Sequence, residues 1–175
     1  MSRRARVIET LAPHLESAYG DIAGRPERAS IGYIATWDAG EGLMGAAADF
    51  TAAILAALEK SRKVDYDRRL TSVGPHRDEP VLALDGIDSR THGSQGEQRT
   101  MALAIKLAAH RAVSEMIDEA PVLLLDDVFS ELDPQRAEAL AKTLPADTQT
   151  LISSARPEDV PVEGAVWRVG DGVRR

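Results

Sequence analysis

The sequence contains no cysteine among its 175 residues, and aromatic residues make up only 4% of it. Disulfide bonds and thiolate metal sites are therefore excluded, and a reducing cytoplasm fits this composition. No apolar run approaches the ~20 residues that a membrane-spanning helix needs, and residues 1–4 do not open a signal peptide. We expect a cytoplasmic protein without a membrane partner, with Leu, Val, Ile and Ala filling its core.

An excess of basic residues is also absent, because the formal net charge is −7. A protein with its own dedicated nucleic-acid surface is usually basic. Any contact with DNA must therefore come from a local patch, or from sequence or partners outside this chain.

The third absence concerns phosphate binding. No glycine is followed by lysine anywhere in the chain, so the phosphate loop G-x-x-x-x-G-K-[ST] is missing. This absence matters because other segments of the chain have the character of an ATPase.

The spacing of apolar residues predicts two regions with a boundary near residue 70. Residues 1–70 read as a helical lobe, and Pro13 is expected to kink or divide its first helix. Residues 71–175 read as α/β, a partial parallel sheet with flanking helices. The predicted helices are 7–19, 46–69, a long helix ending near 117, and 134–144. The predicted strands are 31–37, 81–84 with a hairpin turn at 85–86, a buried parallel strand at 122–125, 148–153 and an edge strand at 166–169. The glycines at 40, 42 and 45 predict a flexible link.

Residues 94–98 have a structural and a functional interpretation. Ser94 followed three residues later by Glu97, before an apolar run, is typical of a capping box. A helix N-terminus also attracts phosphate through its free N–H groups and dipole, and Gly96 lets the backbone approach an anion closely. The two interpretations are compatible. The candidate residues of this segment are Ser94, Gln95, Gly96, Glu97 and Gln98.

Asp126 and Asp127 follow the apolar run 122–125. At the carboxyl end of a central parallel strand they would lie in a ligand crevice. There the first acid can hold Mg²⁺ and the second can orient the attacking water. The alternative is a strand that ends in a solvated turn. The next segment, residues 130–133, favours function, with Asp133 as a helix cap before Pro134.

Two basic segments each have two possible interpretations. In residues 74–78, Gly74 and Pro75 predict a turn, while His76 and Arg77 could meet phosphate or a partner's carboxylate. The second segment is a cluster at the end of the second predicted helix, which reads either as a solvated face or as a DNA-backbone contact. Its members are Arg62, Lys63, Arg68 and Arg69.

Together these motifs resemble the C-terminal half of the RecF family of ABC-type DNA repair ATPases. The resemblance rests on residues 70–78, 94–99 and 123–133, which keep the order of the family's motifs. It implies an SMC-related head in which two subunits sandwich ATP and Mg²⁺. The homodimer would bind DNA at single-strand/double-strand junctions and, with RecO and RecR, help load RecA in repair, replication restart and the SOS response.

The resemblance also implies roles for single residues. Ser94 and Gly96 would touch the γ-phosphate of ATP held by the opposite subunit. Asp126 would serve Mg²⁺, Asp127 would stand at the position of the water-activating acid, and Asp133 would belong to the loop that crosses the dimer interface.

Two departures from the family pattern leave other functions open. The missing phosphate loop predicts a fragment or a truncated gene product that is inert by itself. Where many ABC heads have a switch histidine, this chain has serines, with Ser154 a weak candidate for the sensing role. The alternatives are a non-catalytic module that complements a separate phosphate-loop partner, and a transporter-type cassette. Asp127, the missing histidine and residues 74–77 argue against the cassette.

Overall fold

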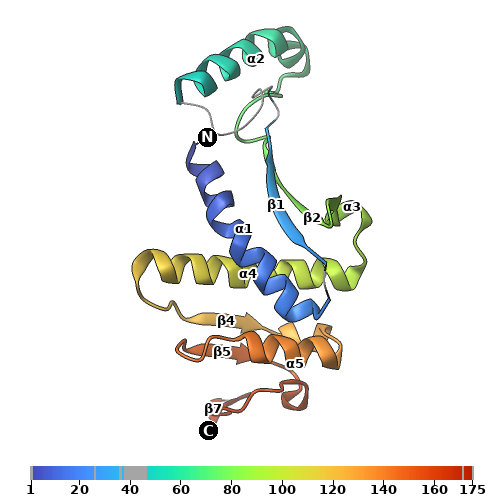
Figure 1. Cartoon of the computed structure of the whole chain (residues 1–175), viewed down its shortest axis with the longest axis vertical. Coiled ribbons are helices and arrows are strands. Elements are labelled where there is room, and N and C mark those ends of the chain that lie inside the picture. The colour runs from blue at the N-terminus through green and yellow to red at the C-terminus, as the bar shows by residue number, and fades with distance from the viewer. Residues whose placement is uncertain (1, 26, 36, 38–46, 171, 175) are drawn as a thin grey trace. The chain divides into compact units, whose positions relative to one another are not determined.

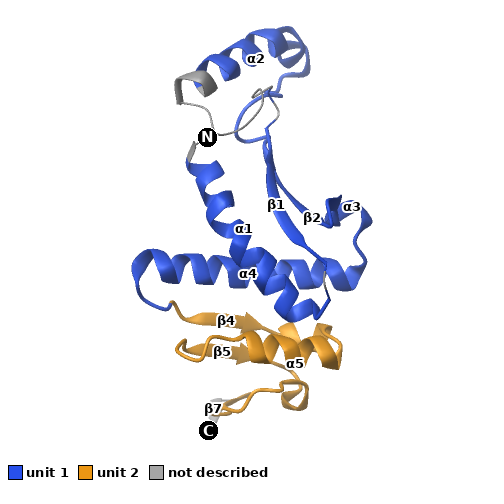
Figure 2. Cartoon of the chain, viewed as in Figure 1, with its two compact units in different colours: residues 1–120 blue, residues 121–175 orange. Residues whose placement is uncertain are grey.

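The computed structural model describes residues 2–25, 27–35, 37, 47–170 and 172–174. They form two compact units, residues 1–120 and 121–175 (Figure 2). These units are not the predicted lobes 1–70 and 71–175, which rest on the pattern of the sequence and stay a prediction. The predicted glycine link at residues 40–45 lies outside the described residues.

The first helix, α1 (Ser2–Ala23), is continuous, although Pro13 lies inside it. The prediction that Pro13 divides this helix is therefore wrong. Pro13 is on the exposed side, where water can satisfy the carbonyl group that loses its partner. Packing on the opposite side holds the helix together across this position.

The core of the first unit lies where α1 packs against α4 (Gln95–Ile117) (Figure 1). Leu15, Ala18, Tyr19 and Ile22 recur at the spacing of one helix face, and each is at most 1% exposed. The facing helix α4 buries a mixture of large and small side chains: Met101, Leu103, Ala104, Leu107, Ala108 and Ala112.

Polar contacts flank this apolar interface. His14 Nε2 lies 3.3 Å from Glu115 Oε2, and Arg111 contacts Asp21 at 3.4 Å. The Arg111 guanidinium also donates to Ser17 Oγ at 3.2 Å. Because these groups are partly solvated, they contribute more to the alignment of the two helices than to stability.

The sheet of the first unit is antiparallel, with the order β1 (Ala29–Ile34), β2 (Glu79–Leu84), β3 (Ile87–Asp88). The hairpin turn at Asp85 and Gly86 is confirmed, with φ of 49° and 80°, as a type I′ turn requires. Because β2 pairs with β1, the parallel sheet predicted for residues 71–175 does not include strand 81–84.

Helices α2 (Ala47–Arg68) and α3 (Ser89–His92) complete the described elements of the first unit. The predicted helix 46–69 is confirmed by α2. The short helix α3 was not predicted, because its single turn is too short to show helical periodicity. No helix among the described residues is both long and apolar enough to cross a bilayer.

The second unit contains the predicted parallel pair. Strand β4 (Leu123–Asp126) lies beside β5 (Thr150–Ser153), with Leu124 opposite Leu151 and Asp126 opposite Ser153. The connection runs through a 3₁₀ turn, Val128–Glu131, and helix α5 (Pro134–Thr143). After a second 3₁₀ turn, Pro157–Asp159, strands β6 (Arg168–Gly170) and β7 (Gly172–Arg174) form a separate antiparallel hairpin. The strand predicted at 166–169 is thus β6, and it does not border the parallel sheet.

One prediction about β4 is wrong. We expected a strand flanked by parallel strands on both sides, but among the described strands β4 pairs with β5 alone. Leu123 and Leu125 are 7% and 4% exposed, whereas Leu124 on the other face is 69% exposed. Val122 and Leu151 are also exposed. Among the described strands the parallel pair therefore has two open edges, and one of its faces exposes apolar side chains.

The α1–α4 interface should dominate the stability of the first unit. Leu15 is fully buried, so Leu15→Ala is expected to lower the free energy of unfolding by about 2–5 kcal/mol. Val7 lies on the same helix but is 54% exposed, so Val7→Ala should change it by less than about 0.5 kcal/mol. Urea unfolding followed by circular dichroism measures both. Equal effects would contradict the assignment of the core.

The uncovered face of β4 and β5 should cause self-association. Leu124→Lys places a charge on this face without disturbing the buried side, so it should reduce concentration-dependent association and the binding of a hydrophobic dye. The matched control is Val113→Lys, because Val113 is an exposed apolar residue on α4 in the first unit. Light scattering over a concentration series measures the effect. An association state that Leu124→Lys leaves unchanged would show that this face is not used.

Candidate functional site

The predicted site residues fall into two groups, one in each compact unit. Residues 94–98 belong to the first unit, and Asp126, Asp127 and Asp133 belong to the second.

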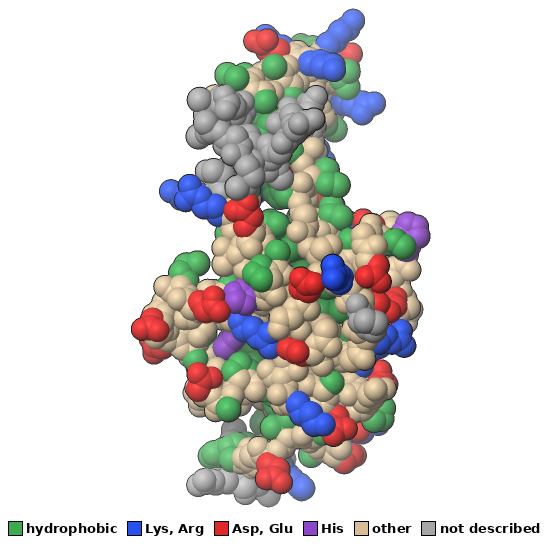
Figure 3. All heavy atoms as spheres, viewed as in Figure 1, with side chains coloured by type: hydrophobic (Ala, Val, Ile, Leu, Met, Phe, Trp, Pro, Cys, Tyr) green, Lys and Arg blue, Asp and Glu red, His purple; other side chains and the backbone are tan. Residues whose placement is uncertain are grey.

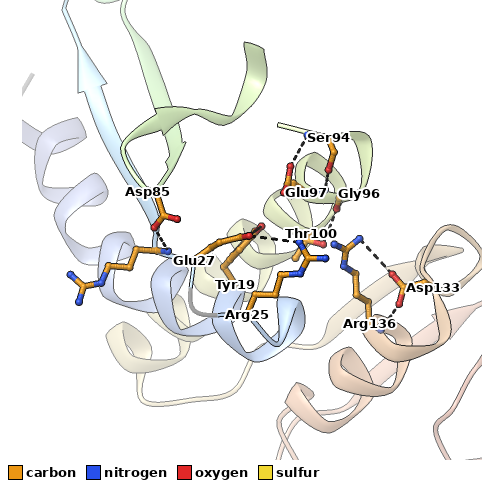
Figure 4. Close-up of polar contacts among 11 residues, drawn as sticks. Tyr19, Arg25, Glu27, Asp85, Ser94, Gly96, Glu97, Thr100, Asp133 and Arg136 are labelled. Carbon is orange, nitrogen blue, oxygen red and sulfur yellow. Dashed lines mark hydrogen bonds and ion pairs between the residues drawn. The ribbon is translucent and has the colours of Figure 1, made fainter. Parts of the chain in front are cut away.

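Ser94 begins α4 with both bonds of a capping box. The Ser94 N–H donates to Glu97 Oε2 at 2.7 Å, and the Glu97 N–H donates to Ser94 Oγ at 3.3 Å (Figure 4). The predicted cap is therefore confirmed. Ser94 and Gln95 are exposed, so the first turn of this long helix presents backbone N–H groups to an incoming anion.

The turn that leads into this helix is rigidly built. A Cβ on Gly93 would lie 2.5 Å from the carbonyl oxygen of Ser89, so the backbone here requires glycine. The side-chain amide of Gln98 donates to the carbonyl groups of Arg90 and Gly93 at 3.2 and 3.0 Å. Gln98 thus braces the turn from within the motif, which is a positioning role rather than a ligand contact.

The start of α3 and the next turn of α4 are also braced. Asp88 caps α3 by accepting from the N–H groups of Thr91 and Arg90, and the Thr91 bond is the main reason why the pKa of Asp88 is lowered. Thr100 is fully buried and donates to the carbonyl oxygen of Gly96 at 2.8 Å (Figure 4). The backbone around residues 94–98 is therefore held from both ends.

In the second unit, Asp126 and Asp127 stand at the carboxyl end of β4, where the neighbouring strand ends in Ser153. The Ser153 hydroxyl donates a short hydrogen bond to Asp126 Oδ1. The Asp127 N–H donates to both Ser153 Oγ and the Ser153 carbonyl oxygen, each at 3.1 Å. Both acids are exposed, which leaves the carboxylates accessible to a cation or a water molecule.

The backbone turns sharply at Asp127. Its φ and ψ are 50° and 26°, the left-handed region, which an aspartate tolerates better than most residues. The following 3₁₀ turn is closed by Ser130 Oγ, which donates to the Asp127 carbonyl oxygen at 2.9 Å. The left-handed residue and this hydrogen bond together end the strand direction at Asp127.

Asp133 is the N-cap of α5, as predicted. Its Oδ1 accepts from the Arg136 N–H at 3.0 Å, and its Oδ2 lies 3.5 Å from the Arg136 guanidinium (Figure 4). Pro134 occupies the first turn. Both carboxylate oxygens have partners within the helix, so Asp133 contributes to the loop mainly by fixing where α5 begins.

The ligands that Mg²⁺ requires decide which of these side chains could hold it. Among the described residues no group of three or more His, Asp or Glu side chains could hold a metal ion. Magnesium in nucleotide sites commonly takes one or two carboxylates and completes its shell with water and phosphate oxygens. Asp126, exposed and with one oxygen held by Ser153, fits that limited role.

The segment around His76 and Arg77 is a tight loop. Gly74 has φ of 135°, and the Arg77 N–H donates to the Gly74 carbonyl oxygen at 2.8 Å. His76 Nε2 and Arg77 Nε each lie 3.2 Å from the Thr71 carbonyl oxygen. Both side chains are exposed, yet part of their hydrogen-bonding capacity holds the loop.

This loop also contains a buried acid that the sequence did not single out. Asp78 is 9% exposed and accepts from Tyr33 Oη at 2.8 Å. Burial and the neighbouring Asp78 raise the pKa of Tyr33. The Arg4 guanidinium contacts Tyr33 Oη and donates to the Pro75 carbonyl oxygen. Contacts between residues this far apart in the chain leave no local signal in the sequence.

The basic cluster lies at the end of α2. All four members, Arg62, Lys63, Arg68 and Arg69, are exposed. Glu59 and Asp67 line the same shallow depression as Arg62, Lys63 and Tyr66, and basic and acidic side chains both cover α2 in Figure 3. The charge of this surface is therefore mixed, and the DNA contact stays a prediction.

The chain was compared with known proteins. No family model matches it. The DNA replication and repair protein RecF of Rippkaea orientalis is 40% identical over 154 residues, which cover 87% of this chain and 39% of that protein. RecF of Clostridium perfringens is 36% identical over 157 residues, which cover 90% of this chain and 41% of that protein.

Two solved structures agree with these relatives. A structure of the recombination mediator protein RecF-ATPrS in the RecFOR pathway matches with a TM-score of 0.77 and 31% identity, covering 97% of this chain and 44% of that one. The corresponding RecF-ATP structure matches with a TM-score of 0.74 and 31% identity, covering 90% and 41%.

These findings define the class of protein: the fold is that of part of an ABC-type ATPase head. The resemblance to the RecF family is confirmed, since nearly all of the chain corresponds to part of a RecF protein. The chain spans about two fifths of the length of the curated relatives that it matches.

The cap at Ser94 can be separated from any ligand role. Ser94→Ala should cost about 1 kcal/mol of stability because the Glu97 N–H loses its acceptor. Ser94→Asp keeps a good cap and should cost less than about 0.5 kcal/mol. Chemical denaturation measures both variants. Equal destabilisation by the two substitutions would show that the capping bond contributes nothing measurable.

Proposed function

We propose that this chain supplies the signature, Walker B and interface-loop elements of a RecF-like DNA-binding ATPase that acts in recombinational repair and replication restart. The observation that carries the proposal is the combination of geometry and relatedness. A capped, exposed helix N-terminus and a pair of exposed acids at a parallel strand end occur in a chain that is 40% identical to a RecF protein.

The first half of the site would bind nucleotide from the opposite subunit of a homodimer. Ser94, Gln95 and the backbone at Gly96 face solvent or are partly exposed at the start of α4. Negative charge at this position interacts favourably with the helix dipole and with the unpaired N–H groups. Glu97 and Gln98 hold the motif in shape through their bonds to Ser94, Arg90 and Gly93.

The second half would serve hydrolysis. Mg²⁺, when bound together with the nucleotide, would neutralise charge on the β- and γ-phosphates. Asp126 would hold the ion through a carboxylate oxygen, and Asp127 would accept a hydrogen bond from the attacking water. Asp133 would set the start of α5 and thereby the path of the loop at the dimer interface.

The cellular role includes DNA and protein partners. We propose binding to single-strand/double-strand junctions in the cytoplasm, together with RecO and RecR, by the complete ATP-bound dimer. His76 and Arg77, with the basic cluster at the end of α2, are the candidate phosphate contacts because their side chains are exposed. Since the net charge of the chain is −7, this binding should be local and strongly dependent on salt.

A second candidate function is a half-head that complements a separately encoded phosphate-loop partner without turnover. The observation that favours it is the absence of any Gly-Lys pair in the chain. Both functions predict that this chain by itself binds no ATP tightly, because the β- and γ-phosphates lack their backbone cradle and lysine.

Both functions can be tested on the chain alone, and a complex with the missing part of the protein distinguishes between them. Millimolar ATP should leave the melting temperature of the chain nearly unchanged, since a ligand at its dissociation constant stabilises by about 0.4 kcal/mol. Co-expression with the part of a RecF relative that this chain does not match, including its phosphate loop, should restore ATP-dependent dimerisation and slow hydrolysis. Light scattering and phosphate release are the measurements.

Matched variants in that complex assign the two halves. Ser94→Asp keeps the cap but repels phosphate, so it should abolish ATP-dependent dimerisation. Asp127→Asn should lower hydrolysis by about a hundredfold or more while keeping the dimer. Asp118→Asn is the control, because Asp118 is also an exposed aspartate with a left-handed backbone. Dimerisation without hydrolysis in the unmutated complex would favour the half-head, and micromolar ATP binding by the chain alone would contradict both functions.

A further inference from the structure

The hydroxyl group of Ser153 connects the ends of the two parallel strands. It donates to Asp126 Oδ1, and its oxygen accepts from the Asp127 N–H at 3.1 Å. The parallel register places Ser153 directly opposite Asp126. One side chain on β5 is therefore bonded to the carboxylate of Asp126, at the end of β4, and to the backbone N–H of Asp127, which follows it.

We infer that Ser153 is a positioning residue for this pair of acids. It holds Asp126 with one carboxylate oxygen engaged and the other available to a cation, and it stabilises the left-handed turn that sets the direction of Asp127. The inference deepens the proposed function, because it rests on Asp126 and Asp127 being the metal-binding and water-orienting acids.

The bonding pattern explains why a hydroxyl group is suited to this position. A serine can donate one hydrogen bond and accept others at the same oxygen atom. A carboxylate accepts, and a backbone N–H donates, so the two bonds use both capacities together. Alanine would provide neither bond, whereas threonine keeps the hydroxyl and suits the end of a strand.

The neighbouring serine has a different role. The Ser154 hydroxyl donates to the carbonyl oxygen of Arg156 at 2.9 Å and accepts from its N–H at 3.1 Å. Ser154 therefore closes a local turn within its own loop. The hydrogen bonds to Asp126 and Asp127 come from Ser153, and the sensing role expected of Ser154 stays a prediction.

The first test measures the backbone of the chain as it is. Removing the side-chain acceptor should speed hydrogen exchange of the Asp127 amide in Ser153→Ala by about two- to tenfold, because one hydrogen bond is lost while the Ser153 carbonyl bond remains. Ser153→Thr should restore the exchange rate of the unmutated chain. Ser154→Ala is the matched control and should leave the Asp127 amide unchanged. An Asp127 exchange rate that is the same in Ser153→Ala would overturn the inference.

The second test uses Mn²⁺ alone as a paramagnetic probe, observed by NMR line broadening at Asp126. Ser153→Ala should need about tenfold more Mn²⁺ for the same broadening, the size of effect typical of groups that orient a metal ligand. Ser153→Thr should again restore the response, and broadening at Asp118 and Glu119 reports non-specific binding to exposed acids.

The two tests separate the inference from the proposed function. If Ser153→Ala binds Mn²⁺ as well as the unmutated chain does, Ser153 does not position Asp126, and the metal role of Asp126 is unaffected. If Asp126 shows no broadening beyond that of Asp118 and Glu119, Asp126 does not hold the ion without the phosphate oxygens of a nucleotide. The Asp127 exchange rate then still decides whether Ser153 orders the turn.

Discussion

The contact between α1 and α4 is the interaction on which the first unit depends. Leu15, Tyr19 and Ile22 are almost completely buried on one face of α1, and Met101 and Leu107 are similarly buried on α4. Ala18, Ala104 and Ala108 are fully buried as well, so small side chains fill this core alongside the large ones. Ser94 lies at the beginning of α4, so the helix that carries this part of the candidate site is also one of the two helices that form the core.

Local hydrogen bonds at the ends of elements determine the shape of the candidate site. Ser94 and Asp133 cap helices, and Ser153 links the ends of two strands. Each group satisfies a backbone N–H or a carboxylate that would otherwise rely on water. These groups are exposed, so each contributes little to global stability, about 1 kcal/mol or less.

The uncovered side of the parallel pair bears on the proposed function. Leu124 and Leu151 are paired on the neighbouring strands β4 and β5, and both are more than half exposed. Apolar area of this kind is unusual for a chain that functions without a further binding surface. It agrees with a chain that spans about two fifths of the length of its relatives, whose remaining part carries the phosphate loop in our proposal.

Much of this architecture was determined by the sequence itself, wherever the signal is local. The capping box at Ser94, the turn at Asp85 and Gly86 and the start of α5 at Asp133 follow from residue types a few positions apart. Such features depend on short-range hydrogen bonding and on apolar periodicity, which a single sequence contains.

Only the tertiary structure decided the rest. It showed that strand β2 joins β1 in an antiparallel sheet, that β4 has one neighbour among the described strands, and that Pro13 leaves α1 undivided. It also brought Ser153 to the two acids and Tyr33 to Asp78. These outcomes depend on which distant segments pair and in what register. That choice is made by packing across the whole unit, and adjacent residue types do not encode it.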